Sequence, residues 1–147
     1  MLNELLGHED IVSVVGFSPD NNIIISGSWW DGTIRFWEKN GREIKKIKNI
    51  TRASQIVFSH DGKMIAVLSE NGIKIWDSEG RLLKTIAEYG TSIQISRDSS
   101  MLRVLSELDT GKGDMVLKLY SLEGNHGKLL DTVSVNRMIA GKRNVSF

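Results

Sequence analysis

The sequence predicts an all-β protein made of repeated four-stranded antiparallel units. Three observations support this prediction. A segment of about 40 residues occurs three times along the 147-residue chain. Within each copy the apolar residues are spaced mostly by two, which is the period of a strand rather than of a helix. Turn-forming dipeptides separate the apolar runs, as they do in hairpins.

The repeat is clearest between residues 11–47 and residues 54–86. Trp37 aligns with Trp76 at an offset of 39 residues, and turn residues align on both sides of it. A third copy occupies residues 91–133, and its first strand matches that of the second copy at an offset of 37 residues. We therefore expect three structural units of the same kind.

Each copy contains four short apolar runs, which predict four strands joined by hairpins. Glycine after asparagine or aspartate is a strong hairpin signal, because glycine accepts the positive φ angles of tight turns. Such dipeptides are Asp31-Gly32, Asn40-Gly41, Asp61-Gly62 and Asn71-Gly72. The three units are expected at about residues 5–48, 49–87 and 88–133 of a single domain, followed by a tail at residues 134–147.

The first copy resembles the WD-repeat family. The resemblance rests on Gly7-His8 before the first strand, Ser26-Gly27-Ser28 in the second, and the run from Asp31 to Trp37 across the next turn and strand. It implies a partial β-propeller of about three four-stranded antiparallel blades. The second copy keeps the family's Trp-Asp pair, and its ending Trp-x-x-x-Gly-Arg-x-x-Lys looks like that of bacterial multi-repeat propellers.

In this family a His, a Ser or Thr, an Asp and a Trp form a hydrogen-bonded structural tetrad. The resemblance places the tetrad at His8, Ser26, Asp31 and Trp37. The pair Trp29-Trp30 lengthens the usual spacing between the Ser and the Asp by one residue, and we expect a β-bulge to absorb it. Whether Ser26 or its neighbour Ser28 supplies the hydroxyl stays open.

The other two copies depart from this tetrad. In the second copy Val67 stands at the position of the serine and Asn71 at that of the aspartate. The third copy has neither His nor Trp at these positions, and Tyr120 takes the tryptophan position. We therefore expect the tetrad in the first copy alone.

The composition excludes several classes of function. A net charge of +1, from 19 basic and 18 acidic residues, gives no overall field of the kind that indicates nucleic-acid or membrane binding. The absence of cysteine excludes disulfides, thiolate metal sites and a cysteine nucleophile. The first residues lack the basic and apolar regions of a signal peptide, so we expect a cytoplasmic protein.

His8, Ser26 and Asp31 are also the residue types of a hydrolase triad, but we favour the structural tetrad. The sequence lacks a Gly-x-Ser-x-Gly elbow, and its three histidines lack metal-ligand spacing. The loop at residues 110–114 contains Gly-Lys without the spacer of a phosphate-binding loop. We expect no enzymatic activity, no cofactor and no metal.

Basic residues cluster on the predicted outermost strand of the first copy, at Arg42, Lys45, Lys46 and Lys48. Lysines on an exposed sheet edge prevent pairing with other chains, and we favour this interpretation. A stripe that binds RNA or lipid is the alternative.

The adjacent residues Trp29 and Trp30 form the most interesting candidate site. Neighbouring strand residues point to opposite sides, so at most one of the two is easily buried. Exposed aromatic side chains are typical interface anchors, and in the WD-repeat family partners commonly bind this top face. Packing of both indoles against a neighbouring blade is the alternative. The possible partner-binding face comprises Trp29, Trp30, Arg52, Glu70 and Tyr89, with Glu9, Asp10, Glu88 and residues 109–114 on the same rim.

Three blades cannot close a ring, because propellers typically close with four to eight. We therefore expect two exposed apolar flanks, rich in Ile and Val at one end and in Leu and Met at the other. A fragment of a longer propeller is the favoured explanation. A half-ring completed by a second copy or another chain, and a decayed reading frame, are the alternatives.

The expected function is that of a non-catalytic protein–protein interaction scaffold. Its expected partners are a protein or peptide, and other propeller blades in the same or another chain. One alternative is a sensor or regulatory segment of a signalling NTPase-type protein. The other is a ligand-binding or enzymatic propeller, since one fold hosts many activities.

Overall fold

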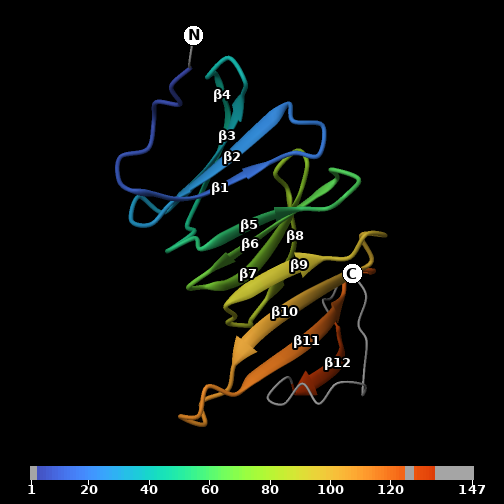
Figure 1. Ribbon diagram of the computed structural model, residues 1–147. Helices are drawn as coiled ribbons and strands as arrows, with labels where there is room; N and C mark the ends of the chain where they lie inside the picture. Colours follow the sequence, from blue (N-terminus) through green and yellow to red (C-terminus); the bar gives the residue numbers. More distant parts are fainter. Residues whose placement is uncertain (1–2, 125–127, 135–147) are drawn as a thin grey trace.

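The computed structural model describes residues 3–124 and 128–134, and these residues form twelve β-strands in three four-stranded antiparallel sheets (Figure 1). We name the sheets blades 1, 2 and 3 in chain order. Blade 1 contains β1 (Val12–Phe17), β2 (Ile23–Ser28), β3 (Thr33–Glu38) and β4 (Glu43–Lys48). Blade 2 contains β5 (Gln55–Phe58), β6 (Met64–Ser69), β7 (Gly72–Asp77) and β8 (Leu82–Ile86). Blade 3 contains β9 (Ser92–Ile95), β10 (Met101–Glu107), β11 (Met115–Ser121) and β12 (Leu129–Ser134).

Within each blade the four strands lie side by side in chain order. The predicted all-β fold class and partial propeller architecture are confirmed by this arrangement. Most of the expected tail, residues 135–147, lies outside the described residues. Across residues 3–124 and 128–134 there is no helix that could cross a membrane.

Two apolar layers lie between the blades. The layer between blades 1 and 2 contains Ile25, Ile34 and Phe36 from one side and Ile56, Ile65, Val67 and Trp76 from the other. The layer between blades 2 and 3 contains Ala66, Leu68, Ile73 and Ile75, facing Ile93, Ile95, Leu102, Val104 and Tyr120. Because β6 lies between both layers, its residues 65–69 are all buried, which explains its continuous apolar sequence.

Polar side chains also join the innermost strands. The side-chain amide of Gln55 donates to the Ile93 carbonyl at 3.1 Å and accepts the Ile93 N–H at 2.7 Å, linking β5 to β9. The hydroxyl of Ser13 in β1 donates to the Ala53 carbonyl at 2.7 Å. These bonds satisfy backbone groups between the sheets and fix the blades relative to one another.

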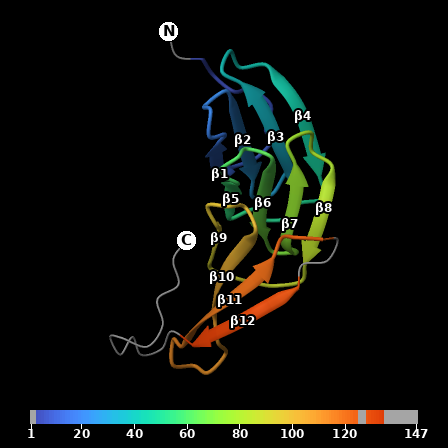
Figure 2. The same ribbon diagram turned by 90° about the vertical axis from the view of Figure 1, so that its right-hand side faces the viewer.

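The turn between the first and second strands of every blade is closed by the same Ser-x-Asp network. The serine hydroxyl donates to the aspartate two residues later and accepts a backbone N–H five residues later. The pairs are Ser18–Asp20 at 2.5 Å, Ser59–Asp61 at 2.6 Å and Ser96–Asp98 at 2.6 Å. These turns lie on one side of the molecule, turned toward the viewer in Figure 2, which we call the bottom face. The opposite side, with the β2–β3 and β6–β7 turns, is the top face.

The front face of a blade is the one that would meet a preceding blade, and in blade 1 the part of it formed by β1 is open. Val15 is 50% exposed and Phe17 is 59% exposed. Ile56 has the same register in blade 2 as Val15 has in blade 1, yet it is 7% exposed because blade 1 covers it. The expected apolar flank is therefore confirmed at this end of the molecule.

The flank of blade 3 is less open than predicted. It carries the expected leucine and methionine side chains, but those on this face of β10 and β11 are at most partly exposed. Met101, Leu105, Met115 and Leu117 are half-buried, and Leu119 is buried. The expected exposed flank, rich in Leu and Met, is therefore present only in part at this end.

Candidate functional site

His8 lies at the centre of the tetrad predicted in blade 1. Its Nδ1 is 2.7 Å from Asp31 Oδ2, and its Nε2 is 2.7 Å from Ser26 Oγ. The indole N–H of Trp37 donates to the same serine oxygen at 2.8 Å. The structure thus brings the four side chains into one buried chain. This chain ties the segment before β1 to β2, β3 and the turn between them.

The structure also distinguishes the two candidate serines. Ser26 contacts both His8 and Trp37. Ser28 instead accepts the backbone N–H of Asp31 at 3.2 Å and closes the β2–β3 turn. Ser26 is therefore the tetrad hydroxyl.

The carboxylate of Asp31 accepts hydrogen bonds from the segment before β1 and from the start of β3, in addition to its contact with His8. It accepts hydrogen bonds from the Thr33 hydroxyl at 2.6 Å and the Thr33 N–H at 2.8 Å, and from the Glu9 N–H at 3.1 Å. Burial raises the pKa of Asp31, but the bonds from Thr33, His8 and Glu9 outweigh it and hold the pKa at about 2. The carboxylate is therefore ionised at neutral pH.

The order Asp31–His8–Ser26 has the connectivity of a hydrolase triad, but its surroundings do not suit nucleophilic attack. The residue Ser26 is only 4% exposed, which leaves its hydroxyl little access to a substrate. The Trp37 N–H also occupies a lone pair of the serine oxygen. A nucleophile needs an accessible oxygen beside oxyanion donors. The arrangement of Asp31, His8 and Ser26 therefore fits a structural hydrogen-bond network better than a catalytic triad.

Blade 2 replaces the tetrad with apolar contacts. Ile50, in the segment before β5, packs in one layer with Val67 and Trp76, and all three are at most 4% exposed. Val67 has the register of Ser26, and Trp76 that of Trp37. Burial of apolar surface therefore stabilises this blade where hydrogen bonds stabilise blade 1.

Blade 3 has a polar network that the sequence analysis missed. The hydroxyl of Tyr120 donates to Glu88 Oε2 at 2.6 Å, and the Lys118 ammonium donates to both Glu88 oxygens at 2.9 and 2.8 Å. Burial raises the pKa of Glu88, but the bonds from Lys118 and Tyr120 outweigh it, so the net shift is downward. The Glu88 side chain is 15% exposed. Glu88, expected among the rim residues, therefore uses most of its side chain within blade 3.

The β2–β3 turn contains both candidate indoles. No register shift occurs between β2 and β3, so the expected β-bulge is wrong. Four residues separate these strands, whereas Glu70 and Asn71 alone separate β6 from β7. The longer turn itself absorbs the extra length. Trp29 is half-buried and Trp30 is 57% exposed, with the ring centroids 6.5 Å apart in an edge-to-face arrangement.

Arg52, in the segment between blades 1 and 2, lies against both indoles. Its Cζ is 4.6 Å from the Trp30 ring centroid and 5.9 Å from that of Trp29. Its Nη1 donates to Glu70 Oε1 at 3.2 Å. These contacts are cation–π and ion-pair interactions that hold Trp30 in place on the surface.

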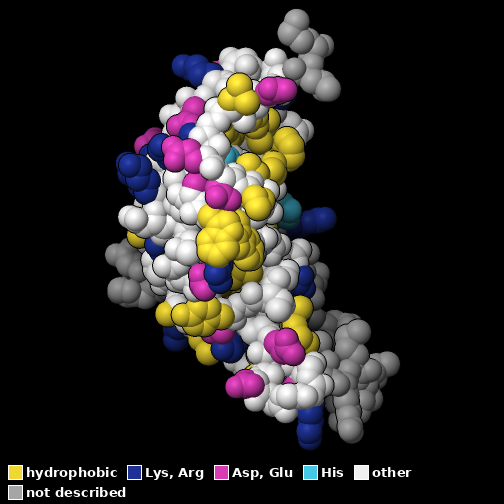
Figure 3. Space-filling model, turned by 90° about the vertical axis from the view of Figure 1, so that its left-hand side faces the viewer, with side chains coloured by type: hydrophobic (Ala, Val, Ile, Leu, Met, Phe, Trp, Pro, Cys, Tyr) yellow, Lys and Arg dark blue, Asp and Glu magenta, His cyan; other side chains and the backbone are white. Residues whose placement is uncertain are grey.

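A cleft of about 250 Å³ opens beside this cluster. Its walls are Trp29, Arg52, Ser54, Leu68, Ser69, Glu70, Tyr89 and Gly90. Tyr89 is 69% exposed on the side toward blade 3. Figure 3 views this top face, where hydrophobic side chains gather near the middle with charged groups beside them. The structure thus brings Trp29, Trp30, Arg52, Glu70 and Tyr89 together on one face.

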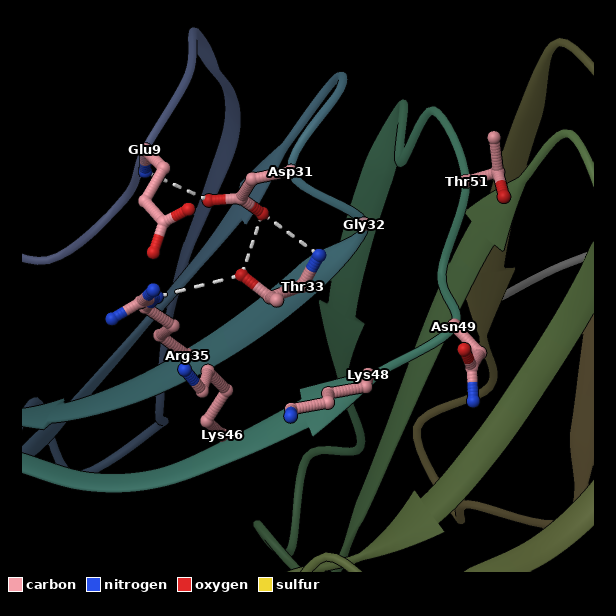
Figure 4. A pocket seen from close by; sticks show the side chains of 9 residues that line it. All are labelled: Glu9, Asp31, Gly32, Thr33, Arg35, Lys46, Lys48, Asn49 and Thr51. Atoms are coloured by element: carbon pink, nitrogen blue, oxygen red, sulfur yellow. Dashed lines mark hydrogen bonds between the residues drawn. The ribbon is translucent and has the colours of Figure 1, made fainter.

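A second hollow, of about 400 Å³, lies at the outer end of blade 1 (Figure 4). Lys46 and Lys48 of β4 line it opposite the carboxylates of Glu9 and Asp31. Arg35, also in its wall, donates to Glu43 at 2.7 Å. The mixture of charges fits the edge-protecting interpretation of the lysines. Among the described residues, no group of three or more His, Asp or Glu side chains could hold a metal ion.

The three blades define a partial β-propeller, and comparison with known proteins agrees with this class. Residues 1–38 match the family model of the WD domain, G-beta repeat. This match identifies the first blade as a WD repeat, and the three four-stranded sheets continue it as a partial propeller.

Relatives of known sequence share the repeat. An uncharacterized WD repeat-containing protein of Synechocystis is 45% identical over 60 residues, which cover 40% of this chain and 17% of that protein. The small ribosomal subunit protein RACK1y of Oryza sativa is 30% identical over 111 residues, which cover 67% of this chain and 33% of that protein. The chain therefore spans at most a third of these two relatives.

A solved structure titled U3-55K shares the fold. It superposes with a TM-score of 0.71 at 21% identity, over 88% of this chain and 41% of that chain. At this identity the likeness establishes the propeller fold alone. The three blades correspond to part of a larger propeller.

Proposed function

We propose that this chain is a non-catalytic interaction segment of a WD-repeat propeller, and that its top-face cleft binds a protein or peptide partner. The observation that carries this proposal is a pair of exposed aromatic residues at one cleft: Trp30 contacts Arg52, and Arg52 and Tyr89 both line the cleft. Large aromatic and arginine side chains contribute most of the binding energy in protein interfaces.

The position of these side chains suits a binding role. Trp30 and Arg52 belong to loops on a rigid scaffold of paired strands, which is where binding residues are commonly found. The contact between Arg52 and Trp30 reduces the freedom of both side chains before a partner arrives. Less entropy is then lost on binding, so affinity improves.

The absence of catalysis is part of the same proposal. The buried Ser26 hydroxyl and its bond from Trp37 explain the His8 site as structural. The open apolar front face of blade 1 supports packing against a further blade, since the matching faces of blades 2 and 3 are buried in that way.

Affinity purification of the intact protein tests the proposal. The wild type is compared with a Trp30→Ala, Tyr89→Ala double variant. The expected result is a set of co-purifying partners that falls at least tenfold in the variant, since loss of an anchor weakens binding by about 2 kcal/mol or more.

Leu83→Ala is the matched control. Leu83 is 45% exposed on the outer strand β8, so its removal deletes a large exposed apolar side chain away from the top face. Partners should be retained in this control. Equal recovery from the double variant and the wild type would contradict the proposal, provided that circular dichroism shows both to be folded.

A further inference from the structure

The two interfaces between blades can be compared position by position, because their strands repeat in register. Phe58 pairs with Ile65 in blade 2 as Ile95 pairs with Leu102 in blade 3. Beyond the third strand, Ser78 corresponds to Leu122. Each follows the strand's aromatic residue by two positions, and each donates its N–H to the equivalent carbonyl, at 3.0 and 2.8 Å respectively.

The two interfaces differ in how this position is filled. Leu122 is 8% exposed and belongs to the apolar layer between blades 2 and 3. Ser78 is exposed and lines a hollow of about 530 Å³ between blades 1 and 2. A hydroxymethyl group in place of an isobutyl group leaves the equivalent space unfilled. The hollow has the size of a typical ligand site.

The hollow has an apolar floor and a polar rim. Ile23, Phe36, Phe58 and Ile65 form the floor. The exposed polar residues Asp20, His60, Asp61 and Ser78 form the rim, with Pro19 and Gly62, and the buried Ser18 also lines the hollow. Apart from Ser78, which follows β7, the rim belongs to the β1–β2 and β5–β6 turns. These turns lie so close together that a Cβ on Gly62 would be 3.6 Å from Pro19 Cδ. Both turns lie on the bottom face (Figure 2), opposite the top-face cleft.

The negative charge at the rim of the hollow favours a ligand that carries a positive charge. Asp20 and Asp61 are exposed, and hydrogen bonds from Ser18 and Ser59, respectively, lower the pKa of each, so both are ionised at neutral pH. The other ionisable groups nearby are His60 in the rim and Lys63 next to Asp61. Two carboxylates above an apolar floor complement a cation attached to an apolar group.

We propose that the hollow binds a peptide segment of a partner protein in which an aliphatic side chain stands next to a lysine or arginine. The aliphatic side chain occupies the space that Leu122 fills in the next interface, and the cation faces Asp20 and Asp61. This site is independent of the top-face cleft, because it shares no residue with it.

Three short peptides test the chemistry on the intact protein by nuclear magnetic resonance titration. Acetyl-Gly-Leu-Lys-Gly-amide is expected to shift the amide signals of Phe58 to Ile65 and of Ser78. The corresponding Ala-Lys and Leu-Glu peptides are expected to bind roughly tenfold more weakly. Absence of binding, or equal binding of all three, would overturn the proposal.

A substitution that copies the filled interface tests the location. Ser78→Leu is expected to raise the melting temperature and to weaken the Leu-Lys peptide at least tenfold, because the new side chain occupies the hollow. The control Thr85→Leu adds an aliphatic group on the exposed face of β8 and should leave peptide binding unchanged. Undiminished binding by Ser78→Leu contradicts the proposal. A lowered melting temperature contradicts it too, since the hollow would then not accept an aliphatic side chain.

Discussion

The guanidinium of Arg52 lies 4.6 Å from the ring centroid of Trp30. This contact joins the segment before blade 2 to the β2–β3 turn of blade 1. The backbone of Arg52, which positions this side chain, has an unusual conformation. Arg52 has a φ of 52°, in the left-handed region that favours glycine, and its N–H donates to the Trp29 carbonyl at 3.3 Å. Side-chain contacts therefore compensate for backbone strain at this position.

Two substitutions separate these contributions. Arg52→Ala loses the contacts with Trp30 and Glu70 and keeps the strained φ. Arg52→Gly loses the same contacts and relieves the strain. In urea denaturation we expect the unfolding free energy of Arg52→Gly to exceed that of Arg52→Ala by about 1 kcal/mol. Equal stability of the two variants would show that the positive φ angle carries no strain.

The tetrad of blade 1 should contribute more to stability than any exposed polar group. His8→Ala leaves Asp31 and Ser26 without their shared partner, and we expect a loss of about 2–3 kcal/mol of unfolding free energy. Trp37→Phe removes one donor to Ser26 and should lose about 1 kcal/mol. The exposed His60 is the control, since His60→Ala should change stability by less than about 0.5 kcal/mol. A small effect of His8→Ala, similar to that of the control, would contradict the structural role.

The network of blade 3 should behave as a coupled unit. Glu88→Ala removes the carboxylate that faces Lys118 and accepts the Tyr120 hydroxyl, and Tyr120→Phe removes that hydroxyl. Each should destabilise by about 1–2 kcal/mol, and the double variant should lose less than the sum. A double-mutant cycle measured by thermal unfolding tests this. Strict additivity would mean that the 2.6 Å contact between Tyr120 and Glu88 contributes nothing.

Acid should destabilise the fold over a defined range of pH. Hydrogen bonds from Ser96 and Ser100 lower the pKa of Asp98 to about 2, and the pKa of Asp31 is also about 2. Because both folded-state pKa values lie below the ordinary value of 3.8, their stabilising effect is complete above about pH 4. It is lost as the pH falls from about 4 toward 2.

Melting temperatures measured between pH 6 and about pH 2.5 check this expectation. The wild type should lose stability mainly below about pH 4. Asp98→Asn should lower the melting temperature at neutral pH. Its melting temperature should also fall less steeply below about pH 4 than that of the wild type, because Asn does not titrate. An unchanged slope in that variant would show that Asp98 does not contribute to the acid sensitivity.

The repeats made much of the fold predictable. Alternating apolar residues and Asp-Gly or Asn-Gly turns follow from backbone physics, so the strands of all three blades could be located from the chain alone. The WD-repeat resemblance likewise pointed to His8, Ser26, Asp31 and Trp37, which the structure brings together.

Other features depend on neighbours that the sequence does not display. The bulge expected at Trp29-Trp30 is absent, because a turn absorbs added residues at less strain than a paired strand does. Glu88 looked like a rim residue, since its partners Lys118 and Tyr120 lie about thirty positions away. Those two do share one face of β11 by the period of two, which was the available signal. The hollow beside Ser78 depends on how blades 1 and 2 pack together, which the sequence does not display.

Hydroxyl-radical footprinting of the intact protein, alone and in complex with its purified partner, tests the central claim most directly. Trp30 and Tyr89 are 57% and 69% exposed, so both should be oxidised readily in the free protein. The account predicts that the partner protects both residues several-fold, while Leu82 and Leu83 on the outer strand β8 remain equally reactive. Unchanged oxidation of Trp30 and Tyr89 in the complex, with protection elsewhere, would contradict it.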